Sequence, residues 1–339
     1  MNLRTGELRP ATPDDLVTKA IPVTYNPKAT CPRWDAFIDR IMDSNADLIG
    51  YLQRLAGLLL TGDITVQELF IFHGGGANGK SVFIDTLGAM LGDYAGVAPD
   101  GFLTIRSHDE HPTEIADLCG KRLVVASETE EGSRLRTQLV KRLTGDARLK
   151  ARFMRQDYFE FDRTHKLVLV TNNKPRINES TNAIWRRIRL IPFTVTIPPE
   201  EQDPHLLERL KAEWPGILSW AVRGCLEWQR EGMNPPGEVL IASEEYRAES
   251  DPLADFITDF CIRGTAEVRV VRGDLFASYQ SWCVQVGEKH GMDQKAFYER
   301  IRRVAGVDDC RWKRGGVVVR GFSGIGMAAV EGVQNGGVR

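Results

Sequence analysis

The chain has 339 residues, of which 42% are hydrophobic and 27% charged, and its net charge is −2. This composition is typical of a globular protein with two or three domains, and it excludes a disordered chain and a small, strongly basic nucleic-acid-binding protein. The six cysteines lack CxxC and zinc-finger spacing, which argues against a disulfide framework or structural zinc and favours a reducing cytoplasm. No apolar run approaches the ~20 residues of a membrane span, so we expect no membrane partner.

The average charge conceals two basic segments. Residues 141–190 contain thirteen Lys or Arg against five Asp or Glu, a net charge of +8, and residues 295–320 carry a net charge of +5. The rest of the chain therefore carries −15. Concentrated basic segments favour binding to polyanions, although solvated basic faces would give the same counts.

The N-terminal part is predicted to be a helical element over residues 1–60. Its first 30 residues are rich in proline and are typical of extended chain and turns. From residue 33 onwards, apolar residues recur at helical spacing, first over 34–41 and then over 48–59.

Four short apolar runs then predict the core of the protein. They cover residues 69–72, 123–126, 167–170 and 188–193, and helical patterns lie between them. Continuous apolar runs of this length are typical of strands buried in a parallel sheet. The alternation of strands and helices predicts an α/β domain over residues 61–232.

The C-terminal part predicts a second, smaller domain over residues 250–325. Residues 274–286 and 293–304 have helical patterns, and residues 311–322 are typical of two short strands around a Gly-Gly turn. The order helix, helix, β-hairpin indicates a winged-helix-like domain, although a generic small α+β module would show the same pattern. Residues 233–249 are predicted to be a linker, and the Gly-rich residues 326–339 a flexible tail.

Residues 74–81 read GGGANGKS and match the GxxxxGK[ST] motif at every fixed position. The motif follows a predicted strand and precedes a predicted helix, which is the context that a phosphate-binding loop requires and that an accidental Gly-rich turn lacks. Glycines let backbone N–H groups face phosphates, a lysine reaches the β- and γ-phosphates, and a serine hydroxyl binds Mg²⁺. We therefore expect ATP and Mg²⁺ to be bound by Gly74, Gly75, Gly76, Ala77, Asn78, Gly79, Lys80 and Ser81.

Two polar residues end neighbouring predicted strands. Glu128 follows an apolar run at the position where an acid holds Mg²⁺ and polarises the attacking water, a role that Glu130 and Glu131 could share. Asn172 follows the next run, where its amide can orient that water, although an Asx turn would use the same residue.

Two arginines, Arg186 and Arg187, precede the last predicted strand. One of them could act as an arginine finger on the nucleotide of a neighbouring subunit, and the alternatives are DNA-phosphate contacts or a solvated cluster. Asn173-Lys174-Pro175-Arg176 has Arg where the guanine-reading NKxD motif has Asp, which disfavours a GTPase.

Five segments occur in the order GGGANGKS, LVVASETEEG, LTGDARLKARFMRQDYFEF, KLVLVTNNKPRI and WRRIRLIPF. This order resembles a superfamily 3 helicase of the phage/plasmid primase–helicase family, which is related to the poxvirus primase-helicase. The resemblance covers about residues 1–325. It implies an AAA+-type P-loop ATPase assembled as a ring, commonly a hexamer, that moves 3′→5′ on single-stranded DNA.

The resemblance also implies roles for single residues. Lys80 and Ser81 belong to Walker A, Glu128 is the Walker B acid, Asn172 is the sensor and Arg187 is the finger, with Arg186 as the alternative. The expected catalytic residues are therefore Lys80, Glu128, Asn172 and Arg187, and the expected metal ligands are Ser81 and Glu128. Many members have a second acid where this chain has Ser127.

A hairpin between Walker B and the sensor projects into the pore of the ring in this family. Here it would run through Arg148, Lys150, Arg152, Phe153 and Arg155, with its tip near residues 154–157. The basic residues would hold phosphates and Phe153 would contact bases or sugars, although a hairpin that contacts only the neighbouring subunit is the alternative. The two glycines that usually precede the hairpin are reduced to Gly145-Asp146.

The sequence thus predicts an ATP-dependent replicative DNA helicase of a phage, prophage or plasmid, acting in the cytoplasm of a bacterial host. The implied partners are single-stranded and forked DNA, other copies of the chain, and a primase module or host replication proteins. Family members often carry a primase module upstream that is absent here, so we expect a stand-alone helicase or a portion of a longer protein. The alternatives are a replication initiator and a nucleoprotein-remodelling or DNA-packaging ATPase that does not unwind.

Overall fold

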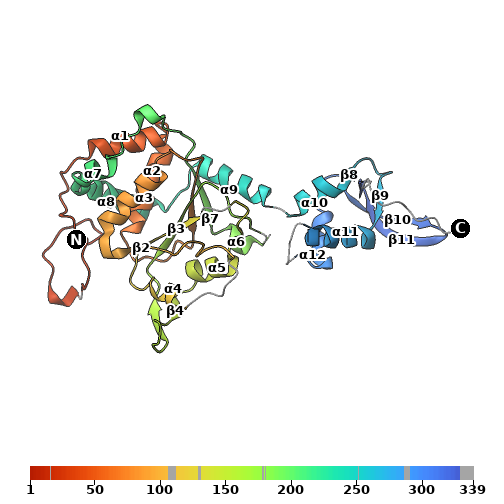
Figure 1. The fold of residues 1–339 in the computed structure, drawn as a ribbon, viewed down its shortest axis with the longest axis horizontal. Coiled ribbons are helices and arrows are strands. Elements are labelled where there is room, and N and C mark those ends of the chain that lie inside the picture. The colour runs from red at the N-terminus through yellow and green to blue at the C-terminus, as the bar shows by residue number, and fades with distance from the viewer. Residues whose placement is uncertain are drawn as a thin grey trace. The chain divides into compact units, whose positions relative to one another are not determined.

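The computed structural model describes residues 1–15, 17–105, 112–128, 131–177, 179, 181–250, 252–285 and 291–328. The chain forms two compact units, Met1–Arg247 and a second unit that begins at Ala248 (Figure 1). Within the described ranges, no helix is both long enough and apolar enough to span a bilayer.

The centre of the first unit is a parallel sheet of five strands in the order β2-β3-β6-β1-β7. The four predicted apolar runs all form strands of this sheet, which confirms the predicted α/β core. The strands are β1 (Leu69–His73), β2 (Ala95–Val97), β3 (Leu123–Glu128), β6 (Lys166–Thr171) and β7 (Ile188–Pro192).

Helices cover both faces of this sheet (Figure 1). Alternate residues of β1 point to opposite faces, so that Phe70 and Phe72 join one core cluster and Leu69 and Ile71 join the other. The first cluster includes residues of α1 (Pro32–Ile41), α2 (Ala46–Leu59), α3 (Lys80–Leu91), α7 (Leu206–Lys211) and α8 (Trp214–Glu231). The second includes residues of α4 (Pro112–Ala116), α5 (Thr137–Gly145), α6 (Asn182–Trp185) and α9 (Gly237–Glu249).

The helical element predicted over residues 1–60 shares its core with the rest of the first unit. Helix α2 begins after Asn45, whose side chain accepts hydrogen bonds from two N–H groups of the first turn. It packs closely along α8 at two glycines, because a Cβ on Gly57 would lie 2.0 Å from the backbone N of Cys225 and one on Gly224 would lie 1.9 Å from the carbonyl O of Gln53.

Residues 233–249, predicted to be a linker, instead consist largely of helix α9. Tyr246 of α9 is 2% exposed and meets the ring of Trp185 edge to face at 5.5 Å. The hydroxyl of Ser243 accepts a hydrogen bond from the backbone N of Leu190 on β7. The first unit therefore extends to Arg247 because α9 is packed on it.

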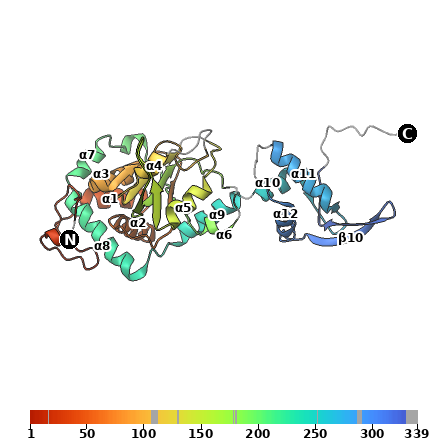
Figure 2. The ribbon, with the colours of Figure 1, turned by 90° about the horizontal axis from the view of Figure 1, so that it is seen from below.

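The second unit has the predicted order of two helices followed by a β-hairpin. Its elements are α10 (Pro252–Phe260), β8 (Cys261–Arg263), β9 (Arg269–Val271), α11 (Arg272–Gln285), α12 (Gln294–Ile301), β10 (Asp308–Arg314), β11 (Val317–Ser323) and β12 (Ile325–Met327). Rings of Phe256, Tyr279 and Phe297 fill its core. Strands β10 and β11 form a ribbon that extends beyond α11 and α12 (Figure 2). Of the predicted tail, residues 326 and 327 belong to β12, and residues 329–339 lie outside the described residues.

Candidate nucleotide-binding site

Residues 74–79 of the GGGANGKS segment form the loop between β1 and α3, and Lys80 and Ser81 begin α3, the order that the motif predicts. Gly76 and Gly79 have φ of 103° and 82°, in the left-handed region that favours glycine. The loop is also tightly enclosed, since a Cβ on Gly74 would lie 2.2 Å from the carbonyl O of Phe193 and one on Gly79 would lie 2.5 Å from the side chain of Ile41. Larger residues at these positions would displace the loop.

The ammonium of Lys80 connects this loop with the predicted sensor. Lys80 is 4% exposed, and its Nζ donates to the carbonyl O of Gly74 at 2.7 Å and to the side-chain Oδ1 atoms of Asn78 and Asn172, each at 3.0 Å. Burial lowers the pKa of Lys80. Asn172 reaches this position because it follows β6, which pairs with β1.

Asn78 is a buried residue whose role the sequence motif does not specify. Its Oδ1 accepts from Lys80, and its Nδ2 donates to the carbonyl O of Phe193 at 3.3 Å. The backbone N–H groups of Phe193 and Ile197 donate to His73 and Ala77. The segment after β7 therefore holds the phosphate-binding loop through three hydrogen bonds.

The predicted Walker B acid lies at the same edge of the sheet. The backbone of Glu128 pairs in register with Thr171 of β6, which in turn pairs with His73 of β1. With strands spaced about 4.8 Å apart, the backbone of Glu128 is about 10 Å from that of His73. Ser81 is exposed in the first turn of α3. Glu130, predicted to share the role of Glu128, lies outside the described residues.

The two predicted finger arginines lie at the amino ends of the strands, opposite the end of the sheet where the loop lies. Ile188, which follows them, pairs with Leu69 at the start of β1, whereas the phosphate-binding loop follows the end of β1. Strand β7 has five residues, so it separates the arginines from the loop of their own chain by about 15 Å. Both arginines therefore lie at the far end of β1 and β7 from the GGGANGKS loop of their own chain.

The structure distinguishes the two arginines by their contacts. Arg187, predicted as the finger, is 8% exposed, and it donates to the hydroxyl of Thr144 at 3.1 Å and to the carbonyl O of Ala183 at 2.6 Å. Arg186 is exposed. The guanidinium of Arg187 is thus used inside its own chain, and Arg186 is the one accessible to another molecule.

The predicted hairpin is formed by β4 (Arg148–Ala151) and β5 (Phe159–Asp162), with an exposed loop over residues 152–158. Phe153 stacks on Phe159 with ring centroids 5.5 Å apart and remains 38% exposed. The guanidinium of Arg152 lies 4.9 Å from the ring of Tyr158, which is 52% exposed. The loop therefore presents cations and aromatic rings together, and Tyr158 is a member that the sequence analysis missed.

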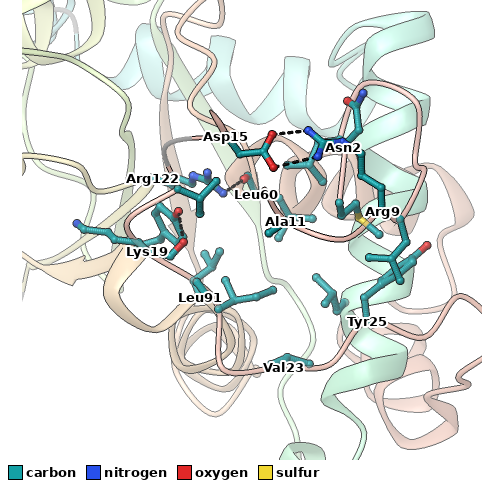
Figure 3. Close-up of a pocket in the computed structure, with 18 of the residues that line it drawn as sticks. Asn2, Arg9, Ala11, Asp15, Lys19, Val23, Tyr25, Leu60, Leu91 and Arg122 are labelled. Atoms are coloured by element: carbon teal, nitrogen blue, oxygen red, sulfur yellow. Dashed lines mark hydrogen bonds and ion pairs between the residues drawn. The ribbon is translucent and has the colours of Figure 1, made fainter. Parts of the chain in front are cut away.

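A separate cavity has a volume of about 530 Å³. It lies under the N-terminal arm, residues 1–30, and Figure 3 shows residues that line it. Arg9 and Asp15 form an ion pair in the arm, and Arg122 donates to the carbonyl O of Leu60 while its guanidinium lies 3.8 Å from the ring centroid of Tyr94. The described residues that line this cavity include none of residues 74–81. It is therefore distinct from the candidate nucleotide site.

Three family models match parts of the chain. Residues 1–43 match a D5 N-terminal-like region, residues 248–317 match a poxvirus D5 protein-like family, and residues 72–187 match a family of unknown function, DUF5906. The three matches fall on the N-terminal region, the core with the phosphate-binding loop, and the second unit.

Two curated relatives of the chain are viral proteins. The chain is 24% identical over 305 residues to “Putative helicase L207/L206” of Acanthamoeba polyphaga mimivirus, a match covering 83% of the chain and 32% of that protein. It is 27% identical over 293 residues to “Putative helicase 184R” of Invertebrate iridescent virus 6, covering 74% of the chain and 30% of that protein. The chain spans about a third of the length of these relatives.

A solved structure has the same fold. The apo structure of the C-terminal region of NrS-1 matches with a TM-score of 0.51 and 12% identity, covering 89% of this chain and 79% of that one.

Proposed function

Because the chain belongs to the primase–helicase family of poxvirus D5 relatives and carries its C-terminal helicase portion, we propose that it is an ATP-dependent replicative DNA helicase. The observation that carries the proposal is the joint placement of Lys80 and Asn172 at the mouth of the phosphate-binding loop. A phosphate-sensing lysine and a water-orienting amide are two of the parts that ATP hydrolysis needs.

The loop fits a nucleoside triphosphate. A Cβ on Gly75 or Gly76 would meet none of the described atoms within 4 Å, so the tip of the loop is open to a ligand. Mg²⁺, when bound, would neutralise the β- and γ-phosphates, and Ser81 and Glu128 are the residues that we propose to hold it. In this proposal Lys80 exchanges part of its present contacts for phosphate oxygens, and Asn172 orients the attacking water.

The position of the arginines supports hydrolysis in trans. They lie at the amino end of β7, whereas the phosphate-binding loop lies at the carboxyl end of β1, so each nucleotide would take its arginine from a neighbour. Head-to-tail contacts of this kind close into rings, and the family resemblance favours a hexamer with an AAA+-type core. We propose Arg186 as the finger in place of Arg187, because Arg186 is exposed.

The hairpin between β4 and β5 would hold single-stranded DNA in the pore. Lys150, Arg152 and Arg155 are exposed and cationic, and Phe153 offers a ring on which a base can stack. Coupled to hydrolysis, these hairpins would draw one strand through the ring with 3′→5′ polarity. The second unit, as a winged-helix-like domain, would bind duplex DNA or a partner such as a primase module or host replication protein, during replication of a phage, prophage or plasmid.

The deciding experiment measures DNA-stimulated ATPase activity and strand displacement on a forked duplex. A Lys80→Ala variant should lose both activities, and a Lys28→Ala variant, altered at an exposed lysine of the N-terminal arm, should keep both. Unwinding by the Lys80→Ala protein would refute the mechanism. DNA-stimulated ATPase activity without any strand displacement by the unaltered protein would favour a remodelling or packaging ATPase.

A further inference from the structure

The hairpin of the second unit places two arginines directly opposite each other. In the register of β10 and β11, Arg311 pairs with Arg320, and Lys313, two residues nearer the tip, pairs with Val318. Residues paired in this way point to the same side of an antiparallel ribbon, and so do residues two apart along a strand. Arg311, Lys313 and Arg320 are exposed and thus form one cationic surface, called here the wing face.

The wing face is unfavourable for the isolated protein. Like charges directly opposite each other in a ribbon, with Cβ atoms about 5 Å apart, destabilise it. Neighbouring arginines have acidic partners, since Arg272 and Arg302 share Asp309 and Arg314 pairs with Asp274. In contrast, Arg311, Lys313 and Arg320 have no acidic partner in the part of the chain that the structure describes. Three uncompensated cations on one surface fit a polyanionic ligand.

The shape of the hairpin narrows the class of ligand. Gly315 and Gly316 have φ of 59° and 86°, the pair of left-handed residues that a tight two-residue turn requires. Phe322 at the base is fully buried, whereas Val317 and Val318 near the tip are 66% and 60% exposed. The result is a narrow, anchored two-stranded ribbon, and the major groove of B-form DNA is wide enough to admit such a ribbon.

We propose that the wing face binds duplex DNA, with Arg311, Lys313 and Arg320 on the phosphates and Val318, which pairs with Lys313 on the same face, against the groove. A duplex presents one negative charge per ~1.7 Å of its axis, which suits several cations on one rigid ribbon better than a flexible acidic peptide does. Guanidinium groups also match phosphate oxygens in geometry. The proposal names the ligand of the second unit and does not depend on the motor proposed for the first.

The experiment measures binding of the full chain to a blunt 20-base-pair DNA duplex by fluorescence anisotropy at several salt concentrations. The double variant Arg311→Gln/Arg320→Gln should bind roughly tenfold or more weakly, with a log–log salt slope lower by about two. A double variant with the same change of charge in the first unit, Arg230→Gln/Arg247→Gln, should bind like the unaltered chain. ATPase activity stimulated by oligo(dT) should be unchanged by the wing substitutions, which separates this proposal from the motor.

A second variant distinguishes a loss of DNA contacts from a loss of folding. Arg320→Glu places an acid opposite Arg311, so it should raise the thermal unfolding temperature while it weakens duplex binding. Duplex binding by Arg320→Glu with the affinity and salt slope of the unaltered chain would overturn the proposal. Tighter binding of the unaltered chain to duplex RNA than to duplex DNA would also overturn it, because the major groove of duplex RNA is too narrow for a ribbon. So would a wing variant that no longer binds poly-glutamate, used as an acidic polypeptide, but binds duplex DNA like the unaltered chain.

Discussion

The Nζ of Lys80 lies 3.0 Å from the Oδ1 of Asn172, although 92 positions separate the two residues in the chain. The contact forms because β1 and β6 are neighbours in the sheet and end at the same level, with His73 beside Thr171. It places an amide within reach of the position that a terminal phosphate would occupy near Lys80. The two residues are therefore expected to contribute to different steps, Lys80 to binding and Asn172 to hydrolysis.

Substitution of Asn172 tests this division of roles. An Asn172→Ala variant should hydrolyse ATP roughly a hundredfold more slowly while it binds a fluorescent ATP analogue almost normally, because the amide would act mainly in the transition state. Turnover and equilibrium binding should be measured on the same preparation. The matched control is Asn173→Ala at the next position of the same loop. Weaker binding of the ATP analogue with an unchanged turnover number would show that Asn172 stabilises bound ATP and not the transition state.

The arginines before β7 can be separated by mixing subunits. Arg186→Ala and Lys80→Ala proteins should each be inactive alone, and mixtures of them should regain part of the DNA-stimulated ATPase activity. The recovery is expected because some interfaces in a mixed ring combine an intact loop with an intact Arg186.

Arg187 should behave differently in the same assay. Removal of its guanidinium leaves the hydroxyl of Thr144 and the carbonyl of Ala183 without their donor, so Arg187→Ala should cost about 1–3 kcal/mol of folding free energy and lower the unfolding temperature. If mixtures of Lys80→Ala with Arg187→Ala regained activity and mixtures with Arg186→Ala did not, Arg187 would be the arginine finger.

Local pattern was sufficient to predict four of the five strands of the parallel sheet and the GGGANGKS loop, because those strands contain continuous apolar runs and the loop has fixed glycines. It missed β2, which has three residues and none of them buried. It was insufficient where distant segments meet. Asn78 bonds to Phe193, 115 positions away, and the burial of Tyr246 that turns the expected linker into a packed helix depends on Trp185. Neither partner can be recognised from its own neighbours in sequence.

The net charge of residues 141–190 also could not be interpreted from local sequence alone, because the burial of its basic side chains depends on distant segments. Arg163 and Lys166 are 3% and 2% exposed and donate to backbone carbonyl groups, and Arg189 forms an ion pair with Glu68. These side chains brace the fold and are not available to a polyanion. A count of charges along the sequence predicted a binding surface, but only the exposed members, which include those of the β4–β5 hairpin and Arg186, are available to form one.

His165 predicts a dependence of stability on acid. It is fully buried, and burial with the nearby Arg163 and Lys166 lowers its pKa from the ordinary value of 6.5 to about 3. Below about pH 6.5 the unfolded chain binds a proton that the folded protein does not, so this residue's contribution to stability falls as the pH drops from 6.5 towards 3.

A His165→Phe variant should lack this component. The free energy of unfolding in urea should therefore fall less steeply between pH 7 and about pH 4.5 for the variant than for the unaltered chain. Comparison of the two proteins removes the contribution of carboxylates that titrate in both. Parallel loss of stability in the two proteins would show that His165 is not responsible.

The β4–β5 hairpin should determine how strongly single-stranded DNA stimulates hydrolysis. Arg152→Gln/Arg155→Gln should raise the concentration of oligo(dT) needed for half-maximal ATPase activity, while the activity without DNA stays the same, because both residues are exposed and distant in sequence from the phosphate-binding loop. Phe153→Ala should weaken DNA binding by about 1–3 kcal/mol if a base stacks on its ring. Arg148→Gln is a matched control, since Arg148 forms an ion pair with Asp162 at the base of the hairpin. Equal loss in the control and in the loop variants, or loss of activity without DNA, would mean that the hairpin serves contacts between subunits and not the DNA strand.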